Sequence, residues 1–185
     1  MGMKTRLIAI GSIFVVLALS ISGCQESSEN ENDHESSFSN YENTEKSFII
    51  EYPKTWNKYE NPPEVPDVDV LFTSQSNEPT KTGSLMITVI YNISMTMDEF
   101  KEAHIENLSI LIPDFDIVSE KNTTLSNLTG YELIFTFTND IYTWRQLEVW
   151  TIHENTLNLI VHQADQAYYE SFTDDVEHMI RSFQT

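Results

Sequence analysis

The chain has 185 residues, of which 29 are acidic and ten are basic, and its formal net charge is −19. All 29 acidic residues follow Cys24, the only cysteine, so the part from Cys24 onward carries a formal charge of −21 with its eight basic residues. Such a surface repels nucleic acid and anionic lipid head groups, and it suits high salt, bound cations or a basic partner. A lone cysteine also excludes a disulfide within one chain.

Residues 1–23 are expected to be an export signal. Lys4 and Arg6 form a short basic start, and an apolar run over residues 7–21 follows. This order is typical of a signal peptide. The alternative is an uncleaved transmembrane anchor, but the apolar run is shorter than the ~20 residues that a spanning helix needs. No basic cluster follows the run to favour the anchor.

The junction Ile21-Ser22-Gly23-Cys24 resembles the lipobox of secreted lipoproteins. The resemblance implies that the Cys24 thiol carries a diacylglyceryl group and that the mature chain begins at this residue. Two acyl chains anchor a protein stably, whereas one chain holds it only marginally. We therefore expect a lipid-anchored protein at the cell membrane, facing the outside of the cytoplasm.

Residues 24–46 are expected to form a disordered acidic tether. The segment is nearly all Glu, Ser, Asn, Asp and Thr, and Phe38 and Tyr41 are its only large apolar residues. So little apolar surface cannot offset the entropy lost on ordering. As a flexible coil, such a tether would average roughly 25 Å from end to end.

Residues 47–185 are long enough for one domain with a substantial core. Apolar alternation predicts the strands, and Thr96 with Glu99 forms a capping box that predicts the start of a helix. Asp165 is a plausible N-cap of a last helix. Several strands are apolar on both faces, so both faces of the sheet must be covered. The predicted elements are strands at 47–52, 68–73, 84–91, 115–125, 131–138, 142–152 and 156–162, and helices at 96–111 and after 165.

The opening of this domain, Phe48-x-Ile50-x-Tyr52-Pro53-x-x-Trp56, is similar to the opening of PsbP-like domains. The order of the following elements also matches, up to a last helix that ends in Arg181-Ser182-Phe183. The likeness covers nearly all of residues 47–185 and is strongest to PsbP-related lipoproteins of archaea and bacteria. It implies an α+β fold, an α-β-α sandwich around a central antiparallel sheet, as in PsbP and the Ran-binding Mog1 proteins. PsbP itself is a non-catalytic subunit that helps a photosystem to retain calcium and chloride.

Metal ligation is a weak expectation at three places. His162 with Asp165, and Asp174 with His178, each offer two ligands, whereas a zinc site needs three or four. An i, i+4 salt bridge explains the Asp174–His178 spacing as well. A third candidate is the acidic loop with Glu64, Asp67 and Asp69, which alternates oxygen ligands as calcium prefers but lacks the glycine turn and distal glutamate of an EF-hand.

No catalytic constellation is found. No serine lies in a Gly-x-Ser-x-Gly elbow, and the glycines form no phosphate-binding loop. His104 lies on the apolar stripe of the helix at 96–111, where a histidine is most often a hydrogen-bonded packing residue. We therefore expect a protein that is not an enzyme and needs no cofactor, calcium excepted.

Two classes of function remain open. The first is a non-enzymatic lipoprotein that docks to, or assists, a membrane or envelope protein complex. The second is a small-ligand or calcium-binding module on the cell surface that uses a cleft between sheet and helix. Exposed apolar residues would favour docking, and a deep pocket with a few polar groups would favour ligand binding.

Overall fold

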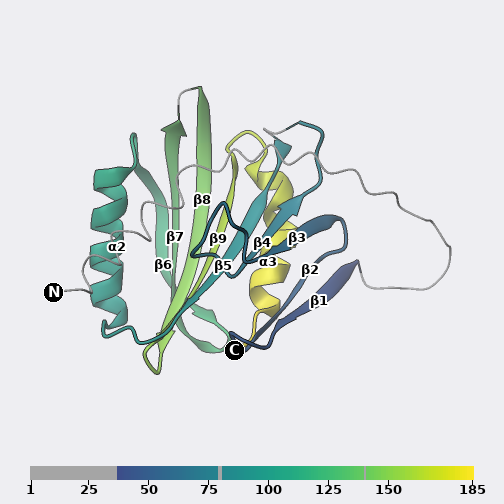
Figure 1. Ribbon diagram of the computed structural model, residues 1–185. Helices are drawn as coiled ribbons and strands as arrows, with labels where there is room; N and C mark the ends of the chain where they lie inside the picture. The colour runs from purple at the N-terminus through teal and green to yellow at the C-terminus, as the bar shows by residue number, and fades with distance from the viewer. Residues whose placement is uncertain (1–36, 79–80, 140) are drawn as a thin grey trace.

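The computed structural model describes residues 37–78, 81–139 and 141–185. Its centre is a seven-stranded antiparallel sheet in the order β3-β4-β5-β9-β8-β7-β6. One helix covers one face, and a second helix with a two-stranded hairpin lies on the other (Figure 1). The strands are β1 (Phe38–Asn43), β2 (Phe48–Pro53), β3 (Trp56–Glu60), β4 (Val70–Ser74), β5 (Ser84–Ile90), β6 (Asp116–Leu125), β7 (Leu128–Asn139), β8 (Tyr142–His153) and β9 (Thr156–Asp165). The helices are α2 (Met97–Leu111), the 3-10 turn η2 (Tyr169–Phe172) and α3 (Thr173–Ser182).

Two-residue turns that contain an asparagine join β6 to β7 and β8 to β9. Ser126 and Asn127 between β6 and β7 both have positive φ, and so do Glu154 and Asn155 between β8 and β9. Two successive residues with positive φ match the right-handed twist of paired strands. The predicted antiparallel meander is therefore present.

Alternation along each strand produces two cores, one on each face of the sheet. Trp150 and Leu159 point toward α2, where Phe100 is fully buried against them. Val149 and Ile160 point the other way, toward α3 and the β1–β2 hairpin. Both faces of the sheet are thus covered, which confirms the predicted α-β-α arrangement. None of the helices in the described ranges is long and apolar enough to cross a membrane.

The boundary predicted for the disordered tether is wrong at its C-terminal end. Residues Phe38–Asn43 form strand β1, which pairs with β2. Tyr41 is only 6% exposed and contacts Phe48 and Phe72, so one aromatic residue attaches this polar segment to the core. The rest of the predicted tether, the signal peptide and Cys24 lie outside the described residues.

Of the two helix starts that the sequence predicts, one is present and the other is wrong. The capping box at Thr96 is present, with both of its hydrogen bonds. Asp165, in contrast, does not cap a helix: it ends β9, and its carboxylate accepts from the Ala167 amide. The chain makes a 3-10 turn first, and α3 begins only at Thr173 without a side-chain cap.

Candidate functional site

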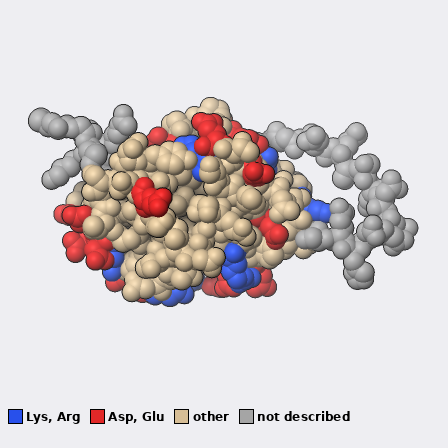
Figure 2. Space-filling model, turned by 90° about the horizontal axis from the view of Figure 1, so that it is seen from below, with Lys and Arg blue, Asp and Glu red and all other residues tan. Residues whose placement is uncertain are grey.

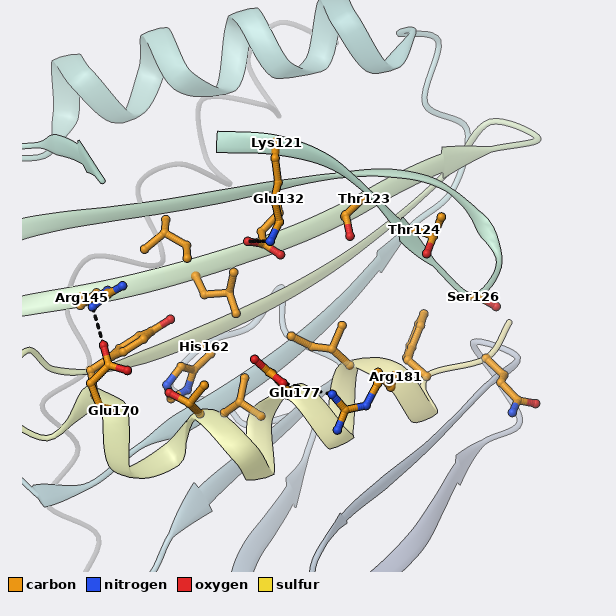
Figure 3. Close-up of a pocket in the computed structure, with 18 of the residues that line it drawn as sticks. Lys121, Thr123, Thr124, Ser126, Glu132, Arg145, His162, Glu170, Glu177 and Arg181 are labelled. Atoms are coloured by element: carbon orange, nitrogen blue, oxygen red, sulfur yellow. Dashed lines mark hydrogen bonds and ion pairs between the residues drawn. The ribbon is translucent and has the colours of Figure 1, made fainter. Parts of the chain in front are cut away.

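A groove lies beside α3, where the helix leaves part of the sheet uncovered. It runs between α3 and the exposed parts of β6, β7 and β8, and its volume is about 580 Å³ (Figure 3). Pockets for small ligands have volumes of ~300–1,000 Å³. Its lining includes charged, aromatic and aliphatic side chains: Lys121, Glu132, Ile134, Arg145, Leu147, His162, Tyr169, Glu170, Val176, Glu177, Ile180 and Arg181.

Charged residues of both signs line this groove in pairs. The pairs are Lys121–Glu132 at 3.0 Å, Arg145–Glu170 at 2.8 Å and Arg181–Glu177 at 3.1 Å. Three of the eight basic residues that follow Cys24 are therefore in one groove. Elsewhere acidic groups dominate the chain, and on the face shown in Figure 2 they are spread around the rim with a few basic side chains among them. Within the groove, the numbers of basic and acidic side chains are equal.

Arg145 is the best-positioned cation of the groove. Its guanidinium lies over the ring of Tyr169, with Cζ 4.5 Å from the ring centroid. Its buried Nε has no hydrogen-bond partner among the described residues. Its partner Glu170 has a side chain that is 74% exposed. The arginine is thus fixed by an aromatic ring and held only loosely by its own carboxylate.

His162 also lines the groove and contacts the same tyrosine. Its ring centroid is 5.0 Å from that of Tyr169, and its Nδ1 donates to the Ser84 carbonyl at 2.9 Å. Burial lowers the pKa of His162 to about 4 and raises the pKa of Tyr169 to about 12. The imidazole is therefore neutral at neutral pH, and its Nε2 is an acceptor without a partner in the described part of the chain.

The floor of the groove is aliphatic. Ile134 and Leu147 from the sheet and Val176 and Ile180 from α3 all contribute, and they belong to or pack against the core on this face. An apolar floor beneath charged walls is suited to an amphipathic ligand.

The acidic loop does not form the expected calcium site. Asp69 is buried, lies 3.2 Å from Lys46 Nζ and accepts from the Val89 amide at 2.6 Å. Glu64 and Asp67 are exposed. Asp69 is already engaged by a cation and an amide, so its carboxylate ties the loop to the domain.

Neither histidine pair comes together. His162 and Asp165 are three positions apart on one strand, so their side chains point to opposite faces. His178 is not bound to Asp174 but lies 2.6 Å from Glu51 and stacks on Phe38. Among the described residues, no three His, Cys, Asp or Glu side chains are grouped so as to hold a metal ion.

A second polar cluster is enclosed beneath α2. His104 Nε2 lies 2.5 Å from Glu148 Oε2, and Gln146 donates to the other carboxylate oxygen at 2.7 Å. All three side chains are almost fully buried, and Phe100 and Trp150 pack against the imidazole. His104 is thus a hydrogen-bonded packing residue, as the sequence predicts.

One end of the molecule is apolar on its surface. Of the nine large apolar side chains that are exposed within the described ranges, six lie where α2 ends, where β6 begins and at the turn between β7 and β8. These six define the apolar end: Ile110, Leu111, Ile117, Val118, Ile141 and Tyr142. Asp114 and Asp116 are exposed beside them. Patches of this kind mark interaction surfaces more often than isolated exposed residues do.

Comparison of the whole domain with solved structures decides its fold. The solution structure of cyanobacterial PsbP from Synechocystis sp. PCC 6803 matches with a TM-score of 0.61, 14% identity, and coverage of 85% of this chain and 98% of that one. The chain has the PsbP/Mog1 fold. Neither a protein-family model nor a curated protein sequence matches this chain.

Two further solved structures with this fold come from other organisms. LpqN of Mycobacterium tuberculosis, described as involved in cell envelope biogenesis, matches with a TM-score of 0.59 and 11% identity over 82% of this chain and 86% of that one. The Ran-binding protein Mog1p of Saccharomyces cerevisiae matches with a TM-score of 0.56 and 12% identity over 80% of this chain and 94% of that one. The PsbP resemblance of the sequence is therefore confirmed at the level of the fold, and a fold does not by itself carry a function.

Proposed function

We propose that the protein is a non-enzymatic, membrane-anchored extracytoplasmic lipoprotein whose PsbP/Mog1-fold domain docks to a protein complex of the membrane or envelope. The observation that carries the proposal is the apolar end, which gathers six of the nine exposed large apolar side chains of the described residues. Exposed apolar side chains gain free energy when a partner removes them from water. The exposed carboxylates of Asp114 and Asp116 beside them favour a partner surface with an apolar centre and a basic rim.

Membrane anchoring in this proposal rests on the lipobox-like junction at Cys24. The solved relatives support the accessory role by analogy alone: one is described as involved in envelope biogenesis and another as binding a protein, Ran. A Cys24→Ser variant tests the anchor. We expect it to leave the membrane fraction, and mass spectrometry of the unaltered protein to find a diacylglyceryl group on Cys24; an intact chain from Met1 would contradict the anchor.

Docking is tested with a photo-crosslinking amino acid placed at Ile141 in native membranes, and with the same probe at the exposed Asn57 on the opposite edge of the sheet. We expect a discrete protein adduct from position 141 only, weakened by Val118→Ser. Adducts with lipid alone, or equal adducts from both positions, would overturn docking through the apolar end.

A second candidate function is ligand binding in the cleft between sheet and helix. The groove beside α3 favours it, because the groove has the volume of a ligand site and contains buried polar atoms without partners among the described residues.

A further inference from the structure

We propose that the groove beside α3 binds a zwitterionic ligand of the amino-acid class, a free amino acid or a short peptide with apolar side chains. The ligand carboxylate lies against Arg145, and the ligand ammonium group faces His162. This inference names the ligand for the second candidate function and is independent of docking, because the groove and the apolar end share no residue.

The charge of the lining decides the net charge of the ligand. Three cations and three carboxylates line the groove, so it has no net charge in a chain that is otherwise strongly acidic. An anion would be repelled by the surrounding acidic surface. A ligand with one charge of each sign avoids this penalty, and its two charges can replace part of an existing pair in the groove.

Arg145 provides the carboxylate site. Its Nε is a buried donor without a partner in the described ranges, and the guanidinium is held in place on Tyr169. Arginine binds carboxylates through two parallel N–H groups, and such charge-assisted bonds are among the strongest hydrogen bonds in proteins. Because Glu170 is largely exposed, it can move into solvent when a ligand carboxylate takes its place.

His162 provides the complementary acceptor. Its Nδ1–H is committed to the Ser84 carbonyl, which leaves a lone pair on the buried Nε2. A ligand reaches this lone pair when the neighbouring rings of Tyr169 and Phe172 move aside. Both His162 and Arg145 contact the ring of Tyr169, so an acceptor and a donor lie beside one aromatic side chain. An α-amino acid carries its ammonium and carboxylate groups on one carbon atom, which suits a site whose donor and acceptor both contact one tyrosine ring.

The aliphatic floor selects the side chain of the ligand. Ile134, Leu147 and Ile180 line the groove next to the charged walls, so an apolar side chain can be removed from water there. The groove is open along α3, and its volume of about 580 Å³ leaves room for more than one residue. A leucine peptide carries its two charged termini farther apart than leucine does. We therefore expect free leucine to be bound, and tri-leucine tests whether the groove also accepts the longer spacing.

The test is isothermal titration calorimetry of the full lipidated protein in detergent. L-leucine and tri-leucine are the probes, and N-acetyl-leucine and leucinamide each lack one charge. We expect saturable binding of the zwitterions, and affinity at least roughly tenfold weaker for each blocked compound, since each loses a charged hydrogen bond. Tighter binding of tri-leucine assigns a peptide, and tighter binding of leucine assigns a free amino acid. Equal affinity for zwitterions and blocked compounds, or no binding of any, overturns the proposal.

Two variants and a control separate this site from a structural effect. Arg145→Gln should weaken leucine binding at least roughly tenfold, while Glu170→Gln should leave it equal or strengthen it because a competing carboxylate is lost. Lys58→Gln, whose lysine pairs with Glu60 on β3 outside the groove, should change nothing. Thermal melts establish that each variant is folded. Failure of Glu170→Gln to bind, or unchanged binding by folded Arg145→Gln, contradicts the assigned roles.

Discussion

The two faces of the central sheet are covered in different ways. On one face, the 15-residue helix α2 covers an aromatic core, and His104 pairs with Glu148 beneath it. On the other face, α3 has ten residues and shares its task with the β1–β2 hairpin. The groove is what this shorter covering leaves open. Buried polar atoms without partners among the described residues occur on both faces, and those of Arg145 and His162 belong to residues that line the groove. We infer that the α2 face holds the fold together and that the α3 face is where ligand chemistry is possible.

The largest stability effect is expected on the closed face. Trp150 is fully buried and contacts Phe100, His104 and Tyr131. Trp150→Ala should lower the free energy of unfolding by ~3–5 kcal/mol, because a large cavity remains. Denaturant melts measure this loss, with the exposed Tyr142→Ala as the control. A loss as small as that of the control would show that the α2 face is not the stabilising one.

Lowering the pH should act on the open face through His162. Its pKa is about 4 in the folded protein and near 6.5 when it is solvated, so between these values only the unfolded chain takes up the proton. The free energy of unfolding should therefore fall by roughly 3 kcal/mol on this account as the pH decreases from 6.5 to 4, and no further below that.

Carboxylates also titrate in this range, so the measurement is the difference between two pH profiles. His162→Gln can still donate to the Ser84 carbonyl but has no proton to take up, and its melts should show a shallower decline with pH. His153→Gln, at an exposed hairpin end, should keep the original decline. Parallel profiles for all three proteins would show that His162 does not titrate as its burial implies.

Removal of β1 should have a smaller effect on the same face. A chain that starts at Glu45 lacks Tyr41 and Phe38, and burial of one aromatic side chain contributes ~1.5–3 kcal/mol. We expect its melting midpoint to be clearly lower, whereas a chain that starts at Ser37 should match the mature protein. Equal midpoints for the two shortened chains would restore the original boundary of the tether.

Much of the fold could be predicted because local signals agreed with it. Alternation located the meander, the Thr96–Glu99 box located α2, and apolar residues on both faces of the strands required two covering layers. Strand β1 was missed because its composition is that of a disordered segment, whereas pairing with β2 and the contacts of Tyr41 and Phe38 order it. Asp165 was taken for a cap because a 3-10 turn between strand and helix leaves no sequence signal of its own.

The groove could not be predicted, because its residues come from six elements, β6 to β9, η2 and α3, and its oppositely charged partners on the sheet lie on different strands. Lys121, Arg145 and Arg181 look like isolated surface cations, and only the register of β6, β7 and β8 brings the first two to one side of the sheet. The one available signal was the scarcity of basic residues. Only eight follow Cys24, so each of them is a candidate for a specific role. Nearness in sequence is also a poor guide at the weak metal candidates, because His162 and Asp165 lie three positions apart on one strand and point to opposite faces.

The smallest stability effect is expected at the apolar end, which belongs to neither core. Ile141 is 81% exposed, so Ile141→Ser should change the free energy of unfolding by no more than ~0.5 kcal/mol. The same change should markedly weaken the crosslink formed from a probe at the exposed Val118 of the apolar end, because docking there depends on apolar area removed from water. Thermal melts and crosslinking yield measure the two effects, and Ile49→Ser, an exposed change on β2, is the matched control. If both variants left the crosslink intact, the apolar end would be an ordinary exposed surface and the docking function would need another site.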